Sequence, residues 1–155
     1  MKFARVGFKS PEAAPLLDGL SWEYEMRYGP GDAVNDVPAA EFDAPSGTFL
    51  VLLDGDVTVA GGGIRRYDQT TCEVKRMWTN PDYRRQGHAR RVLSALVDIA
   101  GTELGYSRLI LETGPAQPEA LAMYRELGYR EIGNYGQYEN SHGFELLLNP
   151  TQAAS

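Results

Sequence analysis

The stretch that decides the fold is Asn80-Pro81-Asp82-Tyr83-Arg84-Arg85-Gln86-Gly87-His88-Ala89-Arg90-Arg91. Before it, residues 71–79 mix β-branched and aromatic side chains, which predicts a strand. After it, apolar residues recur at the spacing of one helical face, which predicts an amphipathic helix from Ala89 to Leu104. The sequence therefore predicts a basic, glycine-containing loop between a strand and a helix.

A loop of this kind is suited to bind an anion. Backbone N–H groups at a helix start have no intrahelical partner, and the helix dipole makes that end positive. Gly87 allows close backbone approach, and the surrounding arginines add charge. We therefore predict a phosphate site here, with an ordinary solvated basic face as the alternative explanation for the arginines.

Composition limits the classes of function. The chain has 155 residues, of which 43% are hydrophobic and 23% charged, as in an ordinary globular protein. Its net charge of −6 argues against nucleic acid as a partner and mildly favours an amine substrate, although an acidic surplus for solubility explains the same number. The single Cys72 cannot form an internal disulfide, and no Cys/His cluster has metal-ligand spacing, so no metal is expected. No apolar run approaches the about 18 residues of a membrane span, and the N-terminus is too polar for a signal peptide, so we expect a cytoplasmic protein without membrane contact.

The first half of the chain predicts a meander of strands preceded by helices. The expected elements are strands at residues 2–8, 48–53, 56–64 and 71–79, a short helix through Leu17, and a second helix at residues 20–28. We expect residues 29–47 to be mostly loop, because proline and glycine recur in them. Asp54-Gly55 is a hairpin signal, and the three glycines at 61–63 predict a bulge or a close backbone approach rather than a phosphate loop, because no helix follows them.

The second half alternates strands with helices. The expected elements after the first helix are strands at residues 107–112, 129–132 and 144–148 and a helix at residues 119–127. A strand reached by a helical crossover lies parallel to its predecessor, so the strand at 107–112 should run parallel to that at 71–79. We therefore predict an α/β fold with a mixed sheet: an antiparallel meander, then a parallel crossover, with helices on both faces. Residues 1–150 are expected to form a single domain and residues 151–155 a frayed tail.

The loop with Arg84, Gly87 and Ala89 is followed, after the predicted strand at 107–112, by the run Ala120-Leu121-Ala122-Met123-Tyr124-Arg125-Glu126-Leu127-Gly128-Tyr129. In this order the two motifs resemble the GNAT superfamily of acyl-CoA N-acyltransferases. The loop matches the family signature Gln/Arg-x-x-Gly-x-Gly/Ala through Arg84, Gly87 and Ala89. The resemblance covers residues 48–148, and the run from Glu112 to Ala120 is similar to that of a bacterial branch of small GNAT proteins.

The second motif lies in the predicted helix at residues 119–127 and just after it. It is similar to the family pattern Asn-x-x-Ala-x-x-Leu-Tyr-x-x-x-Gly-Phe through Ala120, Tyr124 and Gly128, with Tyr129 at the last position. Gln117 replaces the usual Asn, and Met123 replaces the usual Leu. Both departures are mild, so the resemblance implies the fold and the cofactor of the family.

The resemblance implies that acetyl-CoA binds at the loop and at the strand before it. In the family, loop amides hold the pyrophosphate, the strand pairs with the pantetheine arm, and that strand separates from the next one so that the arm enters between them. The implied cofactor-binding residues are Met77, Trp78, Thr79, Arg84, Arg85, Gln86, Gly87, His88, Ala89, Arg90 and Gln117. His88 is expected to cap or pack rather than to catalyse, and Gln117 either orients the cofactor or caps a helix.

Glu73 and Tyr124 are the candidate catalytic residues. Glu73 has the spacing from Gly87 at which histone-type family members carry a basic glutamate, and two-residue alternation places Glu73, Lys75 and Met77 on one face. Glu73 is either the base that deprotonates the acceptor amine or a structural ion-pair partner of Lys75 or Arg76. Tyr124 stands where the family places the acid that protonates the departing thiolate, with packing in the core as the alternative.

The acceptor side is predicted from residues outside these motifs. The candidate wall consists of Trp22, Tyr24, Arg27, Tyr28, Lys75, Tyr135 and Tyr138. Aromatic side chains suit an ammonium group, whereas Arg27 or Lys75 would suit a carboxylate, and packing explains each side chain equally well.

The resemblance implies an N-acetyltransferase that transfers the acetyl group of acetyl-CoA directly to a primary amine. Cys72 would face away from Glu73 on a regular strand, which argues against a cysteine nucleophile. We expect a small-molecule amine (an amino acid, a polyamine or an aminoglycoside-like compound) rather than a protein lysine or N-terminus. A non-catalytic acyl-CoA-binding sensor or regulatory module is the alternative. Open strand edges allow a homodimer, which is common in the family.

Overall fold

The computed structural model describes residues 1–28, 38–113, 118–135 and 141–148. A seven-stranded mixed sheet has the order β1-β2-β3-β4-β5-β7-β6. Its strands are β1 (Lys2–Arg5), β2 (Thr48–Asp54), β3 (Val57–Arg66), β4 (Thr71–Thr79), β5 (Arg108–Thr113), β6 (Arg130–Gly133) and β7 (His142–Leu147). The helices are α1 (Ala14–Tyr28), α2 (His88–Asp98) and α3 (Pro118–Glu126), with 3₁₀ turns η2 (Ala39–Phe42) and η3 (Pro81–Tyr83) and a π-helical turn η4 (Ile99–Glu103).

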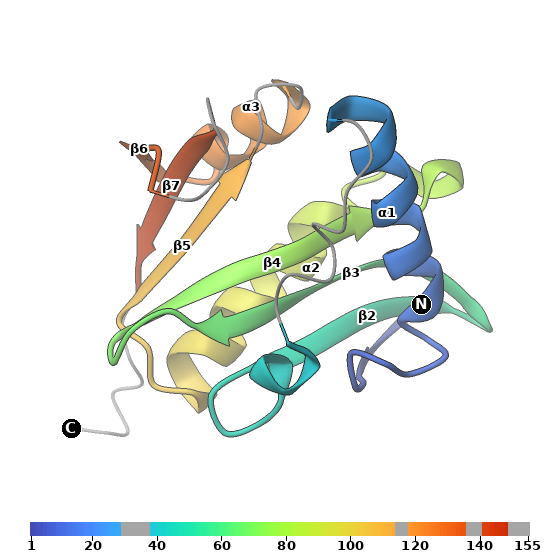
Figure 1. Cartoon of the computed structure of the whole chain (residues 1–155), viewed down its shortest axis with the longest axis horizontal. Coiled ribbons are helices and arrows are strands. Elements are labelled where there is room, and N and C mark those ends of the chain that lie inside the picture. The colour runs from blue at the N-terminus through green and yellow to red at the C-terminus, as the bar shows by residue number, and fades with distance from the viewer. Residues whose placement is uncertain (29–37, 114–117, 136–140, 149–155) are drawn as a thin grey trace.

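Helices cover both faces of the sheet, as predicted (Figure 1). On one face, α1 and η2 enclose a cluster that includes Leu16, Phe42 and Trp78. On the other face, α2 and α3 pack over a larger cluster that includes Leu96 and Tyr124. Apolar side chains at alternate positions of the central strands contribute to these two clusters, because successive side chains of a strand point to opposite faces of the sheet.

The crossover between β4 and β5 is parallel, as predicted, but the two strands pair only briefly. The register joins Thr71, Cys72 and Glu73 to residues 108–110, and no further β4–β5 pair exists in the described chain. Beyond Glu73 the two strands diverge (Figure 1). This separation, which the family resemblance implied, leaves the C-terminal part of β4 without a strand neighbour on the β5 side.

A bulge in β4 corrects one prediction. Gly61 pairs with Trp78 and Gly63 with Lys75, so Gly62 alone faces both Arg76 and Met77. Arg76 has a left-handed φ of 66°. The extra residue shifts the alternation, and Met77 packs on the α2 face, where a Cβ on Gly62 would meet its Sδ. Glu73 and Lys75 share one face, as predicted, but Met77 lies on the other.

The predicted bulge or close approach at the three glycines is confirmed. A Cβ on Gly61 would lie 2.7 Å from Leu16, and one on Gly63 would lie 2.6 Å from Phe42. Side chains of the α1 layer therefore rest directly on the backbone of β3.

Two helices differ from their predicted bounds. The two expected N-terminal helices form one helix, α1, which continues through Gly19. A Cβ at Gly19 would lie 2.4 Å from the Trp78 ring, so only glycine fits at this contact. Helix α2 ends at Asp98 and passes into η4 before Gly105, whose φ of 79° ends the helical segment. The predicted 29–47 loop contains η2, and residues 29–37 lie outside the described part of the chain.

Candidate active site

The loop before α2 presents backbone N–H groups at an open helix start. Asn80 accepts a hydrogen bond from the Asp82 amide at 3.0 Å and so caps η3, which begins at Pro81. Gly87 is the N-cap of α2 with φ 82°, and Arg85 is also left-handed, with φ 65°. The first amides of α2 have no intrahelical acceptor at such a helix start, which suits them to bind an anion.

The arginines of the loop differ in the hydrogen bonds and ion pairs that their side chains form. Arg84 donates to the Thr79 carbonyl at 3.0 Å and to Glu23 of α1 at 2.6 Å. Arg90 forms an ion pair with Glu126 of α3. Arg85 is exposed and has no side-chain hydrogen bond or ion pair within the described residues. Of these three arginines, Arg85 therefore has the guanidinium group that is most available to bind a phosphate.

His88 is buried at the first position of α2. Its ring lies 6.2 Å from the Tyr83 ring, and its nitrogens lie 3.3 Å from Gln86 Oε1 and 3.4 Å from an Arg91 nitrogen. These contacts fit the predicted packing role.

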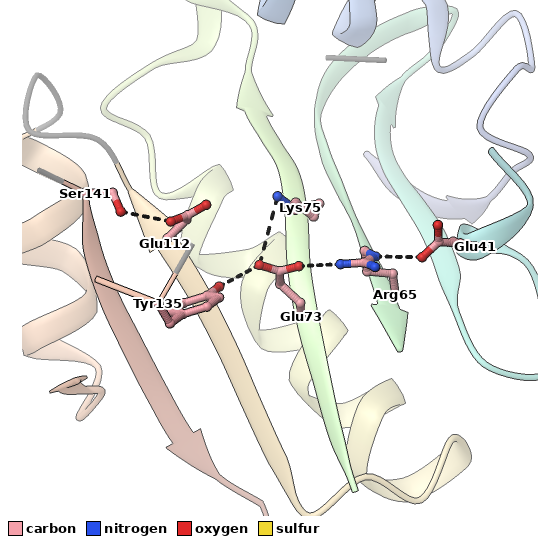
Figure 2. A network of polar contacts seen from close by, with 7 residues as sticks. All are labelled: Glu41, Arg65, Glu73, Lys75, Glu112, Tyr135 and Ser141. Carbon is pink, nitrogen blue, oxygen red and sulfur yellow. Dashed lines mark hydrogen bonds and ion pairs between the residues drawn. The ribbon is translucent and has the colours of Figure 1, made fainter. Parts of the chain in front are cut away.

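Glu73 lies at the last β4–β5 pair, where the two strands begin to separate. It is 3% exposed and faces the side of the sheet that carries η2. Its Oε1 accepts from Arg65 at 2.8 Å, and its Oε2 accepts from the Tyr135 hydroxyl at 2.6 Å (Figure 2). The ion pair predicted with Lys75 is present at 3.9 Å. Arg65, which the sequence did not single out, is the closer cation.

The network around Glu73 extends through Arg65 to η2, and a separate carboxylate contact lies on β5. Arg65 also donates to Glu41 of η2 at 2.8 Å. On β5, Glu112 accepts from Ser141 at 2.8 Å (Figure 2). Arg65 pairs in register with Glu73, so only knowledge of the β3–β4 register could have identified it from the sequence.

Tyr135 reaches Glu73 because Gly143 on β7 has no side chain. A Cβ at Gly143 would lie 2.8 Å from the Tyr135 ring. Burial and the neighbouring Glu73 carboxylate raise the pKa of the Tyr135 phenol far above its usual range. Tyr135 therefore stays neutral and acts as a hydrogen-bond donor to Glu73.

Tyr124 lies on α3 within the larger core cluster. Its ring is 5.6 Å from that of Tyr129 and 5.5 Å from that of Phe144. The predicted core packing is therefore present, and it fixes the position of the phenol.

Cys72 lies on the face opposite Glu73, in the core beneath α2. Burial raises the pKa of its thiol to about 12. A group this far from ionisation is a poor nucleophile at neutral pH.

The predicted acceptor wall is described only in part. Trp22 is 63% exposed on α1. Helix α1 also carries Tyr24, Arg27 and Tyr28, but their side chains lie outside the described part, as do Gln117 and Tyr138. The structure brings together Glu73, Lys75 and Tyr135 from the predicted set.

Comparison with known proteins identifies the family. Residues 15–129 match the model of the acetyltransferase (GNAT) family. The chain belongs to the GNAT family. Among its relatives, the uncharacterized N-acetyltransferase YjgM of Escherichia coli is 30% identical over 131 residues, covering 79% of this chain and 77% of that protein. The uncharacterized protein ML0378 of Mycobacterium leprae is 30% identical over 138 residues, and the chain spans only 37% of its length.

Solved GNAT structures share the fold. A putative acyl-CoA N-acyltransferase from Klebsiella pneumoniae superposes with a TM-score of 0.75 at 22% identity, over 95% of this chain and 97% of that one. A phosphinothricin acetyltransferase from Sinorhizobium meliloti, solved with acetyl-CoA, superposes with a TM-score of 0.70 at 17% identity, over 99% of this chain and 91% of that one.

The residues present in this GNAT acetyltransferase fit acetyl-CoA. The open amides at the start of α2 suit a pyrophosphate. The edge of β4 beyond Glu73, released by the divergence from β5, suits an extended arm that pairs with a strand. No helix in the described residues is long and apolar enough to cross a membrane.

Proposed function

We propose that this GNAT acetyltransferase transfers the acetyl group directly from acetyl-CoA to the primary amine of a small molecule. The observation that carries the proposal is the position of Glu73, a buried carboxylate at the point where β4 and β5 separate. Its Oε2 faces Lys75 and Tyr135. A buried site of this kind suits a small acceptor better than a folded protein surface.

The donor is held by the loop and by β4. In this proposal the amides from Arg85 to Arg90 and the Arg85 guanidinium bind the pyrophosphate, and the backbone of Met77, Trp78 and Thr79 pairs with the pantetheine arm. The thioester then supplies the acetyl group. The ion pair between Arg84 and Glu23 ties the loop to α1 and keeps this cradle in place.

Glu73 and Tyr124 divide the proton transfers. The acceptor ammonium must lose a proton before its nitrogen can attack the thioester carbon, and Glu73 Oε2 accepts that proton. As the new C–N bond forms and the C–S bond breaks, Tyr124 gives its phenolic proton to the sulfur, and the second amine proton restores the phenol. Arg65 donates to Oε1, the other oxygen, and this hydrogen bond can persist when Oε2 is protonated, so the structural and catalytic roles are compatible.

The experiment is a thiol-release assay with acetyl-CoA and a panel of small amines, run beside thermal unfolding with and without CoA. We expect CoA to raise the Tm and at least one amine to release thiol. Stabilisation by CoA without turnover of any amine would instead indicate a non-catalytic acyl-CoA-binding sensor or regulatory module. Turnover of peptide lysines or N-termini alone would indicate a protein acetyltransferase.

A further inference from the structure

Lys75 is a mostly buried cation beside Glu73, and its ammonium group has few polar partners among the described residues. Its side chain is 14% exposed, and its Nζ lies 3.9 Å from Glu73 Oε2, which is beyond hydrogen-bonding distance. This ion pair is the contact that the described residues provide for Nζ. Figure 2 shows the ammonium projecting from β4 on the side of Tyr135 and Glu112. The three N–H donors of Nζ therefore lie near the strand gap with no acceptor among the described residues within hydrogen-bonding distance.

The neighbouring carboxylates are already engaged. Glu73 accepts from Arg65 through one oxygen and from Tyr135 through the other. Glu112 accepts from Ser141 through Oε2. Because a buried ammonium that lacks hydrogen bonds is costly, an anion placed beside Nζ would be bound favourably.

We propose that the acceptor is an amino-carboxylate, and that Lys75 binds its carboxylate. The inference rests on the proposed function and names the substrate class of the same site. In an α-amino acid, the amine and the carboxylate are attached to one carbon atom. A carboxylate on Lys75 Nζ therefore holds the amine beside Glu73 Oε2, the oxygen that takes its proton. An acceptor that carries only ammonium groups would meet the charge of Lys75 instead and would be disfavoured.

The test uses matched sets of acceptors: an amino acid, its carboxamide and its decarboxylated amine, each at saturating acetyl-CoA. We expect the wild-type protein to prefer the acid by about tenfold or more in kcat/KM, as a charged hydrogen bond allows. Lys75→Gln should remove this preference by raising the KM of the acid, while kcat and the KM of acetyl-CoA stay close to their wild-type values. Lys75→Arg should restore part of the preference. Lys9→Gln, on the exposed surface, is the matched control and should change nothing.

Three outcomes would overturn the inference. The first is equal or better turnover of the carboxamide and the decarboxylated amine. The second is a Lys75→Gln protein in which the KM of acetyl-CoA rises and that of the acid does not, because Lys75 would then serve the donor. The third is no turnover of any amine, including those without a carboxylate, which would remove the proposed function together with the inference. Thermal unfolding of both Lys75 variants, which should match the wild-type Tm to within a few degrees, separates a binding defect from a folding defect.

Discussion

At the scale of single residues, two neighbours of Glu73 act differently on its carboxylate. Arg65 neutralises the carboxylate at 2.8 Å and fixes its orientation, whereas the Tyr135 hydroxyl occupies the oxygen on the opposite side at 2.6 Å. An incoming amine must therefore approach Oε2 beside Tyr135. Glu73 can therefore contribute to catalysis through Oε2 and to the structure through its contact with Arg65.

Glu73→Gln separates these two roles. A carboxamide keeps the shape but cannot take a proton, so we expect kcat to fall by about 100-fold or more while the KM of acetyl-CoA stays within about twofold. Steady-state kinetics with a turned-over amine measures both. Glu41→Gln, which changes the other carboxylate on Arg65, is the control and should keep most of the activity. Losses of equal size in kcat and in acetyl-CoA affinity would assign Glu73 to the structure alone.

Tyr124→Phe tests the proposed acid. Loss of the phenol should lower kcat by about 100-fold without weakening acetyl-CoA binding, because the ring still fills the core. Tyr129→Phe is the matched control, since the Tyr129 hydroxyl is buried and has no hydrogen-bond partner within the described residues. It should leave kcat unchanged and keep or raise the Tm. Full activity of the Tyr124 variant would remove Tyr124 from the mechanism.

At the scale of elements, the site depends on two local departures from regularity. The bulge at Arg76 shifts the face that β4 presents, so that Trp78 packs under α1 and Met77 under α2. The left-handed Gly87 then starts α2 with its amides open. Both features lie within one stretch of chain between Lys75 and His88, which joins the acceptor side to the predicted phosphate site.

Gly87→Ala tests the loop as an element. A Cβ at Gly87 meets no atom within 4 Å, so the cost in the free protein is the strain of a left-handed alanine, about 1 kcal/mol. We expect a similar loss of stability for Gly105→Ala, where φ is 79° and the Cβ is equally free. Only Gly87→Ala should raise the KM of acetyl-CoA, by several-fold, because only there does the Cβ stand between the backbone and a phosphate. Equal KM values in the two variants, with unfolding monitored by circular dichroism, would count against the cradle.

At the scale of the whole molecule, acid stability depends on a carboxylate that ties three strands together. Glu145 on β7 is buried and accepts from Arg108 of β5 at 2.7 Å and from Arg130 of β6. Hydrogen bonds from Arg108, and secondarily from Arg130, lower the pKa of Glu145, while burial opposes them. Because its pKa is lower in the folded than in the unfolded state, its contribution to stability is present above the unfolded value of about 4.3 and is lost as the pH falls through the folded value.

Thermal unfolding between pH 7 and pH 2.5 checks this linkage. The wild-type Tm should fall as the pH drops below about 4. Glu145→Gln should lower the Tm at pH 7, because both arginines lose their partner, and should flatten the decline in acid. Glu12→Gln, an exposed carboxylate, is the control and should follow the wild-type curve. Parallel curves for wild type and Glu145→Gln would show that other groups govern the acid response.

Most of the fold followed from local patterns. Alternation along residues 71–79 and the hairpin at Gly55 predicted β4 and the β2–β3 turn nearly to their ends, and the helix after Gly87 predicted the start of α2 to within one residue. These elements are specified by period, by turn chemistry and by capping, which act over a few residues. Local patterns predicted two helices where the structure has the single helix α1, and they did not predict the contact of Gly19 in α1 with Trp78 on a distant strand.

The amino-acid sequence by itself determined the mixed sheet with its parallel crossover, the basic glycine loop and the family to which both motifs belong. Only the tertiary structure decided which side chains surround Glu73. The partners of Glu73, Arg65 and Tyr135, come from separate strands and loops, and the bulge at Arg76 changes which residues of β4 share its face. Local patterns fix the elements because their causes are local. Cross-strand register and a one-residue bulge fix the site, because each decides which distant side chains meet.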